Sequence, residues 1–177
     1  MIEDDHDRRV PGLGSQAAGS VDTPTLAEWI GGANTLDRLI AAFYARVPSD
    51  PLIGPVFSAM GPEHVQHVAD FIAEVFGAGP LYTQNGGSHA GMIRHHMNRN
   101  LTEAQRHRWV ELLLQTADEL DIPSDPEFRS AFVGYIEWGS RLALLNSQSG
   151  TDALEDSAPM PLWNWGPPGG PWRGSGA

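Results

Sequence analysis

The chain has no cysteine among its 177 residues. Disulfides, thiolate metal sites and iron–sulfur clusters are therefore excluded. Lysine and arginine are also scarce: 11 basic residues face 22 acidic ones, for a formal net charge of -11. Such a charge repels phosphate backbones and anionic lipid surfaces, which argues against nucleic acid as a partner.

Long apolar runs are missing as well. No stretch of 18 apolar residues occurs, and the N-terminus lacks a basic region followed by an apolar core. Neither a membrane span nor export is expected, and a cytoplasmic location is the default expectation.

The length and the 41% hydrophobic content fit one domain with a single core. Residues 1–22 are charged and small and predict a disordered arm. Residues 23–147 form the predicted domain. The tail, residues 148–177, is rich in proline and glycine yet contains Trp163, Trp165 and Trp172. Two interpretations stay open for it: an aromatic anchor that folds back on the domain, or a recognition segment.

The domain carries helix signals and no alternating strand pattern, which predicts an all-α fold. Thr23-Pro24 and Thr35 are expected to open the first two helices, and Pro62 the next. Thr102 to Gln105 matches a capping box, and Asp125-Pro126 is expected to start the last helix. Between residues 81 and 100 the apolar period breaks down, and an irregular segment is expected there.

Histidines cluster in and before this irregular segment. Imidazole binds iron well at neutral pH, although a single histidine is more often simply solvated. His64 and His67 could form half of a metal site, but no thiolate or matching carboxylate pair supports zinc or di-iron chemistry. The seven histidines are His6, His64, His67, His89, His95, His96 and His107.

Three segments together carry a family resemblance. Ala42-Phe43-Tyr44-Ala45, Met92-Ile93-Arg94-His95-His96 and the run from Thr102 to Trp109 occur in the order of group II truncated hemoglobins. Over roughly residues 25–147 the chain resembles the actinobacterial members of this group. The resemblance implies a truncated globin: a two-over-two helical sandwich with a short first helix and an irregular segment before the proximal histidine.

The same resemblance implies a heme whose iron is ligated by His96. The separation between His96 and Trp109 distinguishes this residue from His95, which would be rotated by about 100° around a helix. Because cysteine is absent, a c-type attachment is excluded, and the expected cofactor is a noncovalent heme b.

Further residues are implied to surround the heme. Phe57 would stack on the porphyrin, and Val68 lies one helical turn from His64. Group members carry a small residue in place of His64, so a distal hydrogen bond, a solvent gate and direct iron binding all stay open for it. The implied distal and cofactor-binding set is Tyr44, Phe57, His64, Val68 and Trp109, with Tyr82, Arg94 and Arg99 as candidates to reach the heme propionates. Ordinary core packing is the alternative for Tyr44 and Trp109.

An iron ligated by histidine would take dioxygen, nitric oxide, carbon monoxide or peroxide. Donors on Tyr44, His64 and Trp109 would slow ligand loss, which favours nitric-oxide dioxygenation or peroxide reduction over transport. The chain has no flavin or nicotinamide module, so turnover requires an external electron donor. A non-catalytic gas carrier or sensor and a heme-free helical domain are the alternatives, and the chain is expected to be a monomer or homodimer.

Overall fold

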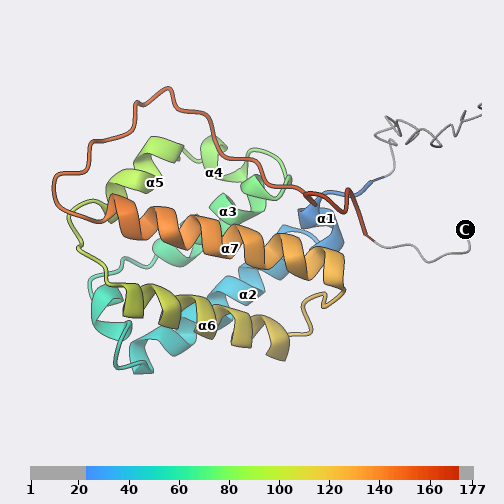
Figure 1. Cartoon of the computed structure of the whole chain (residues 1–177), viewed down its shortest axis with the longest axis horizontal. Helices are drawn as coiled ribbons and strands as arrows, with labels where there is room; N and C mark the ends of the chain where they lie inside the picture. The colour runs from blue at the N-terminus through green and yellow to red at the C-terminus, as the bar shows by residue number, and fades with distance from the viewer. Residues whose placement is uncertain (1–22, 172–177) are drawn as a thin grey trace, which may run out of the picture.

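The computed structural model describes residues 23–171, and these form helices joined by turns and loops (Figure 1). No strand occurs in that range. The elements in chain order are α1 (Leu26–Ile30), α2 (Ala33–Arg46), the 3-10 turns η1 (Val47–Ser49) and η2 (Gly54–Phe57), α3 (His64–Val75), α4 (Leu81–Gln84), α5 (His89–His96), α6 (Glu103–Glu119) and α7 (Pro126–Asn146). The all-α class predicted from the sequence is confirmed.

The longer helices form two layers. In Figure 1, α6 and α7 run side by side across the front of the molecule, with α2 and α3 behind them. The contacts agree with this view, because α2 packs on α3 and α6, and α7 packs on α6 and α5. This is the expected arrangement of two helices over two.

An aromatic core lies between the layers. Phe43, Phe76, Phe128 and Phe132 are each at most 1% exposed. Burying such a side chain contributes about 1.5–3 kcal/mol. On α2 the buried stripe is the one that the helical spacing predicts, namely Leu36, Leu39, Ile40, Phe43 and Tyr44.

Two of the predicted helix starts are confirmed. The Thr102 hydroxyl accepts the Gln105 N–H at 3.2 Å, and the Gln105 side chain accepts the Thr102 N–H at 3.0 Å. The Asp125 carboxylate accepts the Phe128 N–H at 3.0 Å, and Pro126 is the first residue of α7. Both caps pair donors that the first helical turn leaves without partners.

The other three predicted starts are wrong by two or three residues. Helix α1 is capped by Thr25, not Thr23, because Glu28 stands three residues after Thr25 and completes a capping box. Thr35 lies inside α2 and donates its hydroxyl to the Gly31 carbonyl at 3.2 Å. Helix α3 begins at His64, after a turn that contains Pro62.

The segment expected to be irregular contains α4 and α5. Ser88 caps α5 by accepting the Gly91 N–H at 3.0 Å. Periodicity missed these helices because they are short, and Ala90 is the only buried residue of α5. Gly87 shows how tightly this segment packs: a Cβ there would lie 2.4 Å from the Tyr82 ring, so only glycine fits.

The tail folds back along the domain. It leaves α7, passes α5 and α4 and reaches α1 (Figure 1). Trp165 is 5% exposed and its indole N–H donates to the Pro24 carbonyl at 2.7 Å. Of the two interpretations of the tail, the structure shows the back-folded anchor for Trp163 and Trp165. Trp172 and the predicted arm of residues 1–22 lie outside the described residues, and the domain boundary at residue 147 stays a prediction.

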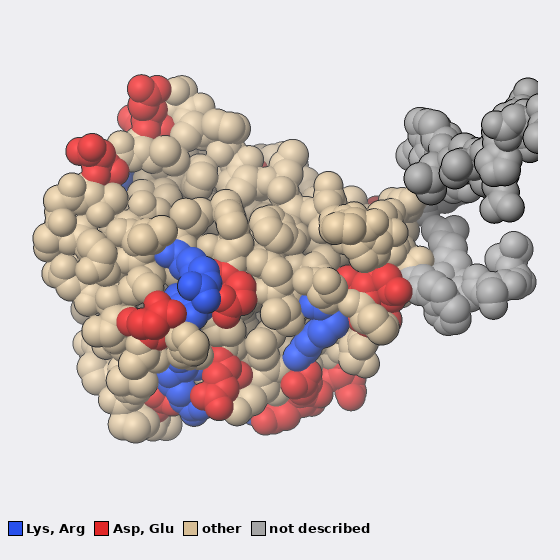
Figure 2. Space-filling view, viewed as in Figure 1, with Lys and Arg blue, Asp and Glu red and all other residues tan. Residues whose placement is uncertain are grey.

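The described surface has paired rather than isolated charges around α6 and α7. Arginines on this face are flanked by acidic side chains (Figure 2), as in Arg129–Asp118 at 2.7 Å and Arg141–Glu137 at 2.9 Å. Within residues 23–171, no helix is both long enough and apolar enough to cross a bilayer.

Candidate functional site

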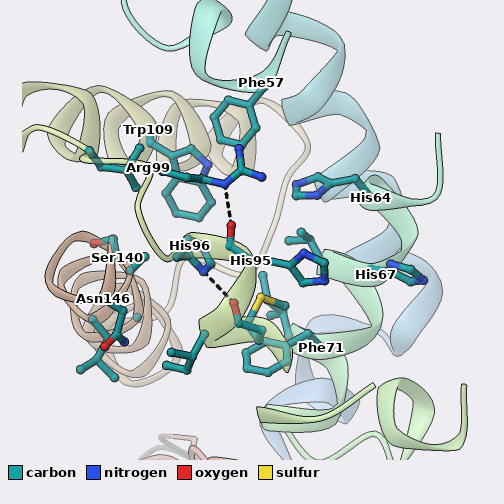
Figure 3. Close-up of a pocket in the computed structure, with 18 of the residues that line it drawn as sticks. Phe57, His64, His67, Phe71, His95, His96, Arg99, Trp109, Ser140 and Asn146 are labelled. Carbon is teal, nitrogen blue, oxygen red and sulfur yellow. Dashed lines mark hydrogen bonds between the residues drawn. The ribbon is translucent and has the colours of Figure 1, made fainter. Parts of the chain in front are cut away.

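A cavity of about 390 Å³ opens between α3, α5, α6 and α7 (Figure 3). This volume lies in the usual range for ligand and cofactor pockets, about 300–1,000 Å³. Most residues that the sequence nominated line it, although they come from six different elements. They are Tyr44, Phe57, His64, Val68, Tyr82, His96 and Trp109.

His96 is the last residue of α5, and a hydrogen bond fixes its tautomer. Its Nδ1 lies 2.9 Å from the Met92 carbonyl oxygen. A carbonyl can only accept, so Nδ1 carries the proton and Nε2 keeps an unprotonated lone pair. Burial lowers the pKa of His96, although the bond to Met92 opposes this in part. A neutral imidazole with one free nitrogen is the form that binds a metal.

His95 also borders the cavity but differs from its neighbour. It is exposed, and its ring points toward α3, away from the ring of His96 (Figure 3). Its main-chain carbonyl accepts the Arg99 Nε–H at 2.5 Å. Because the two histidines lie on the same helix and the same cavity, His95 is a matched control for His96.

Tyr44 and His64 form a hydrogen-bonded pair on another part of the wall. Tyr44 Oη and His64 Nε2 are 3.0 Å apart, and their rings meet edge to face at 5.2 Å. Phe57 packs against Tyr44 at 5.5 Å, and Phe43 lies 4.8 Å from Tyr44 and 5.3 Å from Trp109. The distal residues are thus held by the aromatic core.

The electrostatics of this pair keep both groups neutral. Burial raises the pKa of the Tyr44 hydroxyl, and a hydrogen bond involving Trp109 offsets part of the rise. Burial also lowers the pKa of His64 to about 4, and electrostatic interactions with neighbouring groups, Arg99 among them, add to the shift. At neutral pH, Tyr44 therefore keeps its proton and His64 is uncharged.

The two arginines nominated for the heme propionates have different surroundings. Arg94 is not part of the cavity wall: its guanidinium donates to Asp156 in the tail at 2.6 Å. Arg99 does line the cavity. Tyr82 is buried in the wall, where its ring meets Phe71 edge to face at 5.2 Å.

The sequence interpretation missed several lining residues on α6, α7 and the tail. Arg106 is buried behind the cavity and paired with Glu103 at 2.8 Å and Glu137 at 3.1 Å. Tyr135 and Trp138 line the cavity from α7, and Pro161 from the tail. The three-residue spacing of Tyr135 and Trp138 was the available signal, since it places both on one helix face.

The donor set of the cavity fits a heme. Apolar and aromatic side chains make up most of the wall, one half-buried imidazole offers a free nitrogen, and polar donors lie on other helices. A porphyrin needs a largely apolar slot with such an axial ligand. No covalent attachment through cysteine is available.

Comparison with known proteins decides the family. The model of the bacterial-like globin family matches residues 25–134. The chain belongs to this family. Globins bind heme, so the family implies heme binding and a gas such as oxygen as the ligand.

Individual relatives agree with the group II resemblance. The group 2 truncated hemoglobin YjbI of Bacillus subtilis is 27% identical over 110 residues, which cover 62% of this chain and 81% of that protein. The structure of truncated oxygen-avid haemoglobin from Bacillus subtilis has a TM-score of 0.60 at 26% identity, covering 68% of this chain and 99% of the other. The structure of hemoglobin from Chloroflexus aurantiacus has a TM-score of 0.61 at 29% identity, covering 68% of this chain and 98% of the other. The predicted truncated-globin fold is confirmed.

Proposed function

We propose that this globin holds a noncovalent heme b through His96 and carries out redox chemistry on the ligand that it binds. The free Nε2 of His96 and the absence of cysteine support this cofactor assignment. When bound, heme would supply an iron atom that binds a gas or peroxide molecule and exchanges electrons with it.

The observation that carries the proposal is the 3.0 Å hydrogen bond between Tyr44 and His64, beside Trp109. When His64 Nε2 carries the proton, it donates to the Tyr44 oxygen and leaves the Tyr44 O–H free to point into the cavity. The indole N–H of Trp109 can only donate; it is directed at the Tyr44 oxygen, and a bound ligand would compete with that oxygen for it. Two such donors at about 1.5 kcal/mol each would slow ligand loss roughly a hundredfold.

Slow release suits chemistry better than transport, and two reactions fit. Nitric oxide, dioxygen and one electron give nitrate; hydrogen peroxide, two electrons and two protons give two waters. For the second reaction, the neutral imidazole of His64 is able to accept a proton and return it, because its pKa of about 4 keeps it unprotonated at pH 7. Both reactions require an external electron donor.

The test uses the full chain reconstituted with hemin. We expect nitric-oxide consumption by the reduced, oxygen-saturated protein, or peroxide-dependent oxidation of guaiacol, to exceed the rate with free hemin. Tyr44→Phe and Trp109→Phe should each lower the faster activity about tenfold. Tyr82→Phe removes a hydroxyl from the same cavity outside the distal set and is the matched control. Rates equal to those of free hemin in every protein would overturn the redox proposal.

A second candidate is a gas-responsive module, and one observation favours it. The tail is tied to α5, the helix of His96, through Arg94–Asp156 at 2.6 Å and through His89 Nδ1 and the Pro159 carbonyl at 3.0 Å. Movement of α5 on ligand binding would therefore reach the tail. Hydrogen exchange of residues 148–171, measured with and without carbon monoxide, tests this: unchanged protection would rule it out.

A further inference from the structure

A second aromatic cluster lies on the cavity wall, away from Tyr44 and Trp109. It consists of Tyr135 and Trp138 on α7 and Trp163 from the tail. The ring centroids are 6.2 Å apart for Tyr135–Trp138, 5.5 Å for Trp138–Trp163 and 5.8 Å for Tyr135–Trp163. Each ring therefore contacts the other two.

This cluster connects the cavity to solvent. Tyr135 is 5% exposed and Trp138 is 36% exposed, yet both line the cavity. Trp163 is only partly exposed, so Trp138 is the member that a molecule in solution reaches most easily.

The tail residue of the cluster is held in place. The main-chain N–H of Trp163 donates to the Val75 carbonyl at 2.9 Å, and its indole N–H donates to the Ala131 carbonyl at 2.9 Å. The Trp163 ring also packs closely over Gly134, at a distance where a Cβ would be in van der Waals contact with it. The contact between Trp138 and Trp163 is therefore fixed by the fold.

We propose that Trp138, in contact with Tyr135 and Trp163, is a surface site where a small phenol is oxidised by one electron while peroxide is reduced in the cavity. The inference rests on the peroxide reaction of the proposed function. In a chain without cysteine, indole and phenol side chains are the groups most easily oxidised by one electron. Adjoining aromatic rings also provide a route for an electron between the surface and the cavity.

The electron balance closes with peroxide and phenol alone. Trp138 gives one electron toward the cavity and recovers it from the phenol, which loses one electron and one proton and becomes a phenoxyl radical. Two such events supply the two electrons and two protons that convert one hydrogen peroxide into two waters. Trp138 and the heme end unchanged, and the phenol has not entered the cavity.

The surroundings of Trp138 favour a neutral aromatic donor. The exposed indole offers a flat ring on which a phenol can stack. The adjacent Glu137 is bonded to Arg106 at 3.1 Å and to Arg141 at 2.9 Å, so its charge is compensated. The nearest carboxylate thus gives no strong attraction for a cation.

The experiment uses the hemin-loaded full chain with hydrogen peroxide and guaiacol. Trp138→Phe and Trp163→Phe keep an aromatic ring but remove the easily oxidised indole. We expect Trp138→Phe to lower kcat/KM for guaiacol about fivefold or more, and Trp163→Phe to lower it less. The rate at which peroxide changes the heme absorption should be unchanged in both.

Trp29→Phe is the matched control. Trp29 is 38% exposed and also meets a tail tryptophan, Trp165, at 5.7 Å, but it does not line the cavity. Its replacement should leave guaiacol oxidation unchanged.

A second measurement does not depend on turnover. After peroxide is added without guaiacol, spin trapping and peptide mass spectrometry should locate the radical adduct on Trp138 or its two ring neighbours. Normal guaiacol oxidation in Trp138→Phe and Trp163→Phe, with adducts only on Tyr44 or Trp109, would overturn the surface site while the proposed function stands. Neither guaiacol oxidation nor an adduct in the unmodified protein would overturn both it and the peroxide reaction.

Discussion

The two sides of the cavity are built differently. The distal side belongs to the core: Phe43 is fully buried, Tyr44 is 6% exposed, and both pack in edge-to-face contacts with their neighbours. The proximal side is α5, a short helix that buries only Ala90 and is tied from outside by the tail. Segments with few buried contacts open most easily.

Because of this difference, we expect ligand retention and heme retention to depend on different parts of the site. Contacts of the distal side decide how a ligand is held, and changes there should leave heme retention intact. Contacts of α5 and the tail decide how firmly His96 is positioned, and changes there should affect heme loss before ligand release. Each of the following predictions breaks or sharpens this separation.

The largest effect is expected from the tail anchor. Trp165→Ala removes a buried indole and should lower the free energy of unfolding by about 3–5 kcal/mol and speed heme loss. Leu162, which is 80% exposed, is the control: Leu162→Ala should stay within about 0.5 kcal/mol. Deleting residues 158–177 should lower the melting temperature as well. Chemical denaturation and heme transfer to apomyoglobin measure these effects, and an unchanged melting temperature would argue against the anchor.

A distal change should affect the ligand instead. Tyr44→Phe removes one donor, and we expect dioxygen to leave about tenfold faster, the equivalent of about 1.4 kcal/mol. Stopped-flow displacement by carbon monoxide measures this rate. Heme loss should stay as in the unmodified protein, and Tyr82→Phe should leave the dioxygen rate unchanged. Faster heme loss in Tyr44→Phe would show that the distal side also controls heme retention.

The smallest effect is expected at the ion pair between α5 and the tail. Its side chains are 49% exposed at Arg94 and 85% at Asp156, so the pair should contribute about 0–1 kcal/mol. Arg94→Ala and Asp156→Ala should therefore be equally mild in heme loss. A faster loss in Arg94→Ala alone would mean that Arg94 contacts the heme directly, as the sequence resemblance implied.

Local signals in the sequence predicted the parts of the fold that depend on neighbouring residues. The caps at Thr102 and Asp125 and the buried stripe of α2 follow from residues within one or two helical turns. The start of α1 was missed because a plausible Thr-Pro signal precedes the true capping box at Thr25. Helices α4 and α5 were missed because they bury too little to show a period.

In the site, too, the contacts between residues far apart in the sequence could not be predicted from local signals. The resemblance nominated Tyr44 and His64, but their hydrogen bond joins residues 20 positions apart and needs the fold. The partner of Arg94 lies 62 residues away in the tail, in a region without a periodic pattern. Trp138 and Trp163 come together for the same reason, since no local rule links α7 to the tail.

The identity of the iron ligand is the central claim, and the heme absorption spectrum tests it most directly. His96→Ala and His95→Ala are compared after reconstitution with hemin, with the Soret band and the rate of heme loss as readouts. We expect His95→Ala to keep the spectrum of the unmodified protein, and His96→Ala to lose the histidine-ligated band or release heme rapidly. An unaltered Soret band in His96→Ala, with loss of the band in His95→Ala, would contradict the account.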